Sequence, residues 1–204
     1  MMRKPKILGF AGSLREKSFN KKLLRIALKG SADAGAEITF VDLRELPMPI
    51  YNSDDEAANG LDENAQAFQN LLAKHDGFLI ASPEYNGSLP AALKNAIDWA
   101  SRPDGKYNRS EIFTGKFAAI CTTSPGSFGG VRVLSHLRGV LTSIGVYVLP
   151  MEIAIPFVAE KFSGEGEEMS DDRTRGILED LGASLVRAVR KNRFEPELAL
   201  GTRS

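Results

Sequence analysis

The feature that most limits the fold of this chain is a regular alternation of short apolar runs with segments of helical periodicity. The apolar runs cover residues 7–11, 38–41, 77–81, 117–122 and 146–149. The helical segments cover residues 20–34, 63–74, 91–101, 131–144 and 172–191. In the last segment, Ile177, Leu181, Leu185 and Val189 recur every four residues and form one apolar face. This order of elements predicts β–α–β units with parallel strands.

The predicted strands are apolar on both faces, so helices must cover both sides of the sheet. Five such units predict an α/β fold with a doubly wound, five-stranded parallel sheet in the flavodoxin-like strand order 2-1-3-4-5. We expect a single domain over residues 1–193 and a C-terminal tail, without periodicity, over residues 194–204. Irregular stretches interrupt the pattern at residues 46–60, 103–114 and 160–170. Of these, residues 103–114 are expected to form an exposed loop, and the acidic residues 54–56 a solvated one.

Composition excludes several classes of function. The 204 residues carry a formal net charge of zero, so there is no general electrostatic attraction to nucleic acid or to an anionic membrane. One cysteine excludes an internal disulfide, and two histidines do not form a zinc-type cluster. No apolar run approaches the roughly 18 residues of a membrane span. The basic N-terminus leads directly into a strand rather than into a signal-peptide core, so a cytoplasmic location is expected.

The segment from Gly12 to Ser18 lies between the first strand and the first helix, where doubly wound sheets bind ligands. Backbone N–H groups at a helix N-terminus attract anions. Ser13, Arg15, Ser18 and Asn20 add further donors, which suit a terminal monophosphate. The segment lacks the third glycine of the dinucleotide fingerprint and the Gly-Lys-Ser/Thr ending of a P-loop. A solvated loop with an ordinary helix cap is the alternative, because caps use the same residue types.

Two more polar loops follow the third and fourth strands, at the same edge of the sheet. In "SPEYNGSLP", backbone amides and Asn86 suit the polar edge of a flat heterocycle, and Tyr85 suits an aromatic wall. The alternative is that both residues only pack and cap a turn. The later loop, "TTSPGSFGG", contains Ser127, but without the Gly-x-Ser-x-Gly spacing of a hydrolase nucleophile. Three converging loops of this kind predict a mononucleotide pocket.

Two segments resemble the signature segments of the NADPH-dependent FMN reductase family: "GSLREKSFNKKLL" and "PEYNGSLPAALKNAIDWASRP". The family has a flavodoxin-like fold, and the resemblance extends over about residues 6–150. It implies that the FMN phosphate is surrounded by Ser13, Arg15, Ser18 and Asn20, and that Gly12, directly before them, belongs to the same binding site. It implies that the isoalloxazine lies along Pro83, Glu84, Tyr85, Asn86 and Gly87. The loop after the fourth strand is similar to the third flavin loop of the family, with Ser124 and Gly126 as its expected contacts.

The resemblance also implies an activity. NADPH, or NADH, would pass a hydride to FMN, and two electrons would then go to a small-molecule acceptor such as a quinone, chromate, an azo compound or free flavin. No protein acid or base is expected, and therefore no catalytic residue is named. The alternatives are a non-enzymatic electron carrier of the flavodoxin type, a nucleotide- or redox-sensing module, and an NAD-type dehydrogenase. The neutral charge disfavours the carrier, and the missing third glycine disfavours the dehydrogenase.

Family members form homodimers or homotetramers with the flavin near a subunit boundary. This implies that Tyr85, Arg102 and residues 103–114 lie at an interface. Cys121 lies within a strand-like run and is expected to be buried and inert. His136 is expected to be a packed or surface residue, and Trp99 a packing residue.

Overall fold

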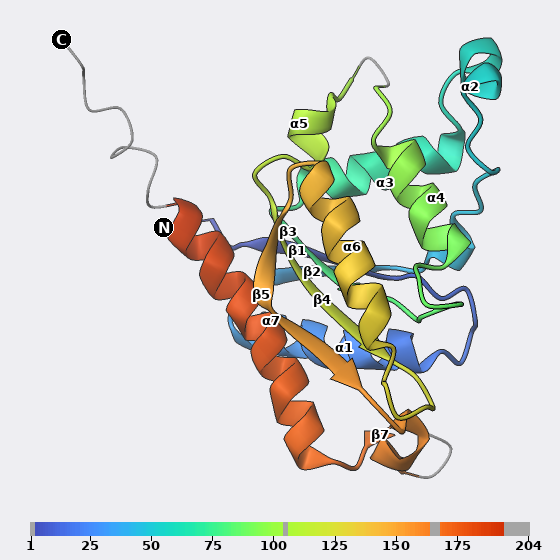
Figure 1. Ribbon diagram of the computed structural model, residues 1–204. Helices are drawn as coiled ribbons and strands as arrows, with labels where there is room; N and C mark the ends of the chain where they lie inside the picture. Colours follow the sequence, from blue (N-terminus) through green and yellow to red (C-terminus); the bar gives the residue numbers. More distant parts are fainter. Residues whose placement is uncertain (1–2, 104–105, 164–167, 194–204) are drawn as a thin grey trace.

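The computed structural model describes residues 3–103, 106–163 and 168–193, and it contains the expected parallel sheet. The strands are β1 (Lys6–Ala11), β2 (Glu37–Val41), β3 (Gly77–Ala81), β4 (Phe117–Thr123) and β5 (Tyr147–Ile155). They pair in the order β2-β1-β3-β4-β5, and every neighbouring pair is parallel (Figure 1). Gly9 of β1 lies opposite Phe40 of β2 and Leu79 of β3. The predicted fold class and strand order are confirmed.

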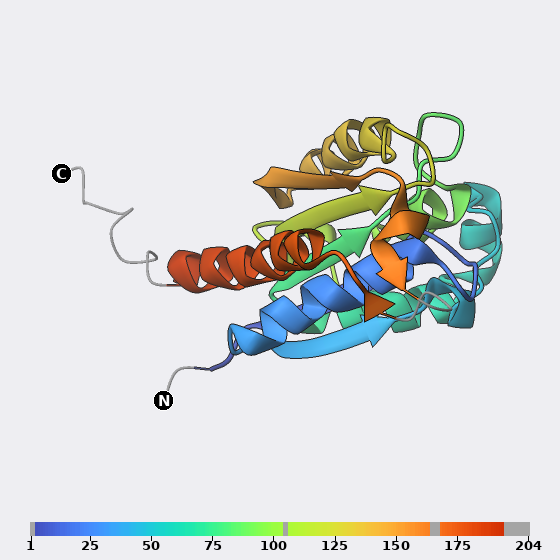
Figure 2. The same ribbon diagram turned by 90° about the horizontal axis from the view of Figure 1, so that it is seen from below.

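Helices cover both faces of the sheet, as the view from below in Figure 2 shows. One face is covered by α1 (Phe19–Asp33) and α7 (Asp172–Arg193), and the other by α3 (Glu63–Lys74), α4 (Ala91–Ala100) and α6 (Val131–Ser143). Side chains alternate along β1: Ile7 packs with α1 and α7, whereas Leu8 and Phe10 pack with α3 and α4. The alternation produces two apolar cores, one on each side of the sheet.

Two glycines allow α1 and α7 to approach each other at backbone distance. A Cβ atom on Gly182 would lie 1.9 Å from the carbonyl oxygen of Ala27, and one on Gly30 would lie 2.0 Å from that of Glu179. The Ser31 hydroxyl donates to the Gly182 carbonyl at 2.9 Å. Helix α7 therefore packs closely against α1, the helix that follows residues 12–18.

Several elements were not predicted from the sequence. The stretch 46–60 contains α2 (Ser53–Asn59), the stretch 103–114 contains α5 (Arg109–Ile112), and β5 continues well beyond residue 149. Helix α2 is short, but the Asn52 side chain accepts from the Asp54 N–H at 3.0 Å, and acidic residues fill its first turn. Two 3₁₀ turns, η1 (Leu43–Glu45) and η2 (Val158–Lys161), and a hairpin of β6 (Phe162–Ser163) and β7 (Glu168–Met169) complete the fold.

The single domain expected over residues 1–193 stays a prediction, and the tail 194–204 lies outside the described residues. Among the helices of the described ranges, none has both the length and the apolar composition that a membrane crossing needs.

Candidate cofactor site

The three polar loops are the first loop (residues 12–18), the second loop (residues 82–90) and the third loop (residues 122–130). They meet at the carboxyl edge of the sheet, and hydrogen bonds fix them there. The Gly12 N–H donates to the Ala81 carbonyl at the end of β3 (2.9 Å), and the Ser82 N–H donates to Cys121 in β4 (3.0 Å). The Asn20 amide donates to the Thr123 carbonyl and accepts from its N–H, both at 3.1 Å. The start of α1 is thereby tied to the end of β4, 103 residues further along the chain.

The first loop presents donors that the protein itself does not use. Ser13 and Ser18 are buried, and Ser18 occupies the N-cap position of α1 without a side-chain cap bond. The Ser13 hydroxyl makes one long contact, from the Arg15 N–H at 3.4 Å. The Arg15 side chain is exposed, and within the described ranges no ion pair or hydrogen bond engages its guanidinium. A buried helix N-terminus with free donors is suited to an anion.

Asn20 differs from the other predicted phosphate contacts. Both polar atoms of its amide are used by Thr123, so the side chain joins the first loop to the third. The amide nitrogen has two N–H groups and Thr123 accepts from one of them, so Asn20 joins these loops and its contact with a phosphate stays a prediction.

A buried ion pair supports the first turn of α1. The Lys21 ammonium lies 2.6 Å from the Asp42 carboxylate at the end of β2, with side chains 2% and 12% exposed. Burial alone would raise the pKa of the Asp42 carboxyl, but hydrogen bonds from Lys21 and from the Arg44 N–H lower it more, and the net pKa is below its ordinary value. The helix that starts at the first loop is therefore fixed to β2 by a charge pair that water hardly reaches.

The second loop is a tight two-residue turn. Tyr85 and Ser88 exchange two backbone hydrogen bonds of 3.0 Å, and Asn86 and Gly87 between them have φ values of 51° and 80°. Positive φ at both central positions is the signature of a type I′ turn, for which Asn-Gly is the preferred sequence. Asn86 and Gly87 therefore build the turn, beside which Tyr85 is 47% exposed. The Asn-Gly pair is the sequence signal for this geometry.

The Glu84 side chain is engaged by α6. Its carboxylate accepts from the backbone N–H of Arg132 at 2.9 Å and from the Arg132 Nε at 2.8 Å. Sequence reasoning missed Arg132, because the two residues are 48 positions apart and no local pattern connects them. Pro83 is buried beside Glu84.

The third loop packs against the end of β5. Ser124 is half-buried and Gly126 is exposed, and the Gly126 carbonyl accepts from the N–H groups of Gly129 (3.2 Å) and Phe157 (3.4 Å). Below the loop, the Thr122 hydroxyl is fully buried and has no hydrogen-bond partner among the described residues. Cys121 is buried as expected, and burial raises the pKa of its thiol to about 12.

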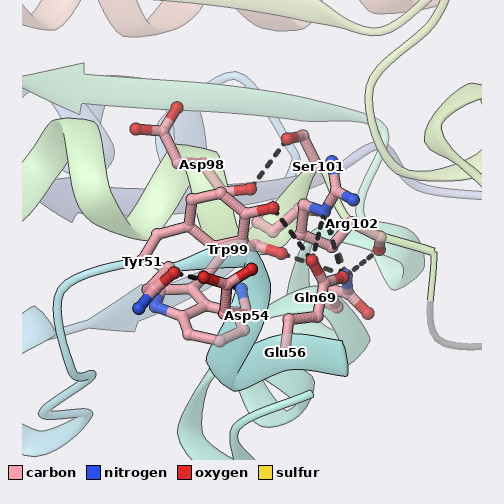
Figure 3. A network of polar contacts seen from close by, with 10 residues as sticks. Tyr51, Asp54, Glu56, Gln69, Asp98, Trp99, Ser101 and Arg102 are labelled. Carbon is pink, nitrogen blue, oxygen red and sulfur yellow. Dashed lines mark hydrogen bonds and ion pairs between the residues drawn. The ribbon is translucent and has the colours of Figure 1, made fainter. Parts of the chain in front are cut away.

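The acidic residues 54–56 do not form the expected solvated loop, as Figure 3 shows. They lie on α2, where the Glu56 carboxylate accepts from the Arg102 Nε at 2.9 Å and from the Tyr51 hydroxyl at 2.9 Å. Hydrogen bonding from Arg102 is the main reason that the pKa of Glu56 is below its ordinary value. Arg102, expected at a subunit interface, thus binds within its own chain. Trp99 packs as expected, with its indole N–H donating to the Pro49 carbonyl at 2.8 Å.

Comparison with known proteins decides the family. The model of the NADPH-dependent FMN reductase family matches residues 5–160. The chain belongs to this family. It is 39% identical to the 2-hydroxy-1,4-benzoquinone reductase of a Burkholderia species over 175 residues, which cover 85% of this chain and 90% of that protein. It is 35% identical to the NADPH:quinone oxidoreductase of Arabidopsis thaliana, over 89% of this chain and 92% of that protein.

A solved structure agrees with the fold. FerB from Paracoccus denitrificans, a flavoenzyme NAD(P)H:(acceptor) oxidoreductase, superposes with a TM-score of 0.77 at 31% identity, over 92% of this chain and 98% of that chain. The expected cofactor, FMN with NAD(P)H as co-substrate, is confirmed at the level of the family. The donors of the first loop fit the phosphate end of FMN, since Ser13, Ser18 and Arg15 are not used internally as ion-pair or cap partners.

Proposed function

We propose that this protein is an NAD(P)H-dependent FMN oxidoreductase whose acceptors are small molecules, with quinones first and chromate, azo compounds or free flavin as further candidates. The observation that supports this most is the set of unused donors at the start of α1, placed at the same sheet edge as a rigid turn with an exposed tyrosine. The quinone preference follows from the printed names of the relatives.

Residues of the first loop are proposed to hold the phosphate. The guanidinium of Arg15 presents a planar set of donors that can bind a phosphate in bidentate fashion. The hydroxyls of Ser13 and Ser18, together with the first N–H groups of α1, would supply the remaining hydrogen bonds. Because these serines are buried, the phosphate would be partly desolvated, and each bond would be stronger than at an open surface.

The second and third loops are proposed to hold the ring. In the turn, the N–H groups of Tyr85 and Ser88 are used, which leaves Asn86, Gly87 and the Tyr85 side chain for contacts with the ring, beside Pro83 and Glu84. In the third loop, Ser124 and Gly126 would place backbone or hydroxyl donors at the ring edge that becomes negative on reduction. When bound, FMN supplies the two-electron chemistry between NAD(P)H and the acceptor.

The redox balance needs no protein acid or base. NAD(P)H gives up two electrons and one proton, and a quinone that accepts two electrons takes up two protons, the second from water. His136 is the histidine near these loops, and its Nδ1 lies 2.9 Å from the Ser88 hydroxyl. We assign it no step in the reaction.

The test is purification, followed by an absorbance scan and assays of NADPH and NADH oxidation with a panel of acceptors. We expect flavin absorbance and rapid oxidation of NAD(P)H with 1,4-benzoquinone. Flavin without turnover would favour an electron carrier or a sensing module, and a colourless protein that ignores added FMN would refute the proposal. Assembly as a homodimer or homotetramer and a cytoplasmic location, where NAD(P)H is available, stay predictions, as does the interface role of Tyr85, Arg102 and residues 103–114.

A further inference from the structure

We propose that Arg132, at the start of α6, is a positioning residue that joins the second and third loops into one rigid unit and thereby controls binding of a flat aromatic acceptor. This inference rests on the proposed function for the identity of the ligand, but its structural part can be tested without it. Arg132 contacts both loops: its guanidinium binds the Glu84 carboxylate of the second, and lies 5.4 Å from the ring centroid of Phe128 in the third.

The contact with Glu84 has better geometry than an ordinary surface ion pair, although the Arg132 side chain itself is 58% exposed. The Arg132 Nη2 lies 2.7 Å from one carboxylate oxygen, and the Glu84 side chain is only 8% exposed. Short, multiply bonded arginine–carboxylate pairs with one partner out of water are the strong members of their class. Removal of either side chain would leave the other without its partner.

Glu84 also serves as a helix cap from a distant part of the chain. The N-cap residue of α6 is Gly130, which has no side chain to offer, and the Arg132 N–H in the first turn donates to Glu84 instead. A carboxylate at a helix N-terminus interacts favourably with the helix dipole. The same carboxylate thus fixes the helix start and the second loop together.

A second attachment lies one turn further along α6. The Nδ1 of His136 is 2.9 Å from the Ser88 hydroxyl, and positions 132 and 136 share a helix face. Glu84 and Ser88 lie on the two sides of the Asn86–Gly87 turn. Two attachments on opposite sides of a short turn fix its orientation as well as its position.

This attachment explains how exposed aromatic residues are held at the edge of the sheet. Tyr85 is 47% exposed and Phe128 is 66% exposed, so neither is fixed by burial. Large exposed aromatic residues on rigid supports suit the apolar faces of a planar ligand such as a quinone. Arg132 links their two loops, and it therefore fixes the relative placement of the two side chains.

The test uses Arg132→Gln, Glu84→Gln, the double variant and the conservative Arg132→Lys, with Arg187→Gln as the matched control. Arg187 pairs with Asp180 on α7, where both side chains are about 60% exposed. We expect Arg132→Gln to raise KM for 1,4-benzoquinone about tenfold. The Kd for FMN should rise less than this KM, because the phosphate contacts of the first loop are untouched, and anaerobic reduction of the bound flavin by NADPH should stay within about threefold of wild type.

The four variants separate positioning from a general structural role. Glu84→Gln should match Arg132→Gln, the double variant should add little to either, and Arg132→Lys should restore part of the loss. Additive effects, or an unchanged KM in Arg132→Gln, would overturn the proposal. An equal change in FMN affinity and acceptor KM would also overturn it.

Hydrogen exchange distinguishes failure of this inference from failure of the proposed function. The N–H groups of Tyr85 and Ser88 form the turn, so they should exchange faster in Arg132→Gln and Glu84→Gln than in wild type or Arg187→Gln. Faster exchange in a protein that does not oxidise NAD(P)H would uphold the positioning role and refute the oxidoreductase. Unchanged exchange would refute the positioning role whatever the activity.

Discussion

The first loop and the pair formed by the second and third loops use their polar groups in opposite ways. In the first loop, the side chains of Arg15 and Ser18 make no hydrogen bond or ion pair with the rest of the described chain. In the other two, Glu84 and Arg132 bind each other, and the N–H groups of the turn bind within the turn. Free side-chain donors suit a charged group, whereas rigid backbone and exposed aromatic rings suit a flat one. The difference indicates which end of a flavin nucleotide each region receives.

The largest effect is expected from removing the support beneath the first loop. Lys21→Met leaves the Asp42 carboxylate buried without its partner, and should lower the free energy of unfolding by about 3–5 kcal/mol. The matched control is Lys29→Met on the same helix, where the side chain is 62% exposed and a much smaller loss is expected. Urea titrations of the three proteins measure the difference. Equal losses in both variants would show that burial of the Lys21–Asp42 pair has no special importance.

The next largest effect should separate the two regions functionally. Arg15→Ala should raise the Kd for FMN by about 10- to 100-fold, because it removes hydrogen bonds to a charged phosphate. At saturating FMN, its KM for benzoquinone should equal that of wild type, which is the reverse of the pattern expected for Arg132→Gln. Fluorescence titration and steady-state assays give the two constants. If Arg15→Ala and Arg132→Gln changed the Kd for FMN and the KM for benzoquinone alike, the assignment of phosphate binding to the first loop and acceptor binding to the other two would be wrong.

A smaller effect tests the backbone of the second loop. Gly87→Ala places a Cβ at a φ of 80° and should cost about 1–2 kcal/mol of stability. Gly139→Ala, in the interior of α6 with open space around it, should instead gain up to about 1 kcal/mol. In thermal unfolding, a lower stability of Gly87→Ala and a higher stability of Gly139→Ala would support the tight turn. A neutral Gly87→Ala would mean that the turn does not require a left-handed residue.

The smallest effect concerns pH. The pKa of Asp42 is below its ordinary value in the folded protein, so the pair stabilises the fold at pH values above 3.8 and loses this contribution as pH falls through the folded pKa. The stability difference between wild type and Lys21→Met should therefore be constant at neutral pH and shrink in acid. Unfolding measured from pH 7 down to about pH 3 checks this. A stability difference that stays constant in acid would contradict the conclusion that ionised Asp42 stabilises the fold through its pairing with Lys21.

Local patterns in the sequence predicted the sheet, its strand order and the position of all three loops. They did not predict contacts between distant residues, and such contacts decide which donors remain free. Asn20 matched a phosphate contact by type and spacing, yet its amide binds Thr123. Glu84 matched a ring contact, yet Arg132 engages its carboxylate. In both cases the partner is contributed by β4 or α6, and only the folded chain brings the two together.

The acidic residues of α2 illustrate the same limit. Pro47, Pro49 and a run of charge favour a loop in the sequence, but the Asn52 cap and the pairing of Glu56 with Arg102 stabilise a short helix. The partner arginine lies 46 residues away. Local propensity is weak over seven residues, and the tertiary contact decides the outcome.

The most direct measurement is the affinity of the flavin-free protein for FMN compared with riboflavin, which has the same ring but lacks the phosphate. If the first loop holds a phosphate, wild type should bind FMN about a hundredfold or more tightly than riboflavin, and Arg15→Ala should reduce this ratio at least several-fold. Equal affinity for the two flavins, or a ratio unaffected by Arg15→Ala, would contradict the account.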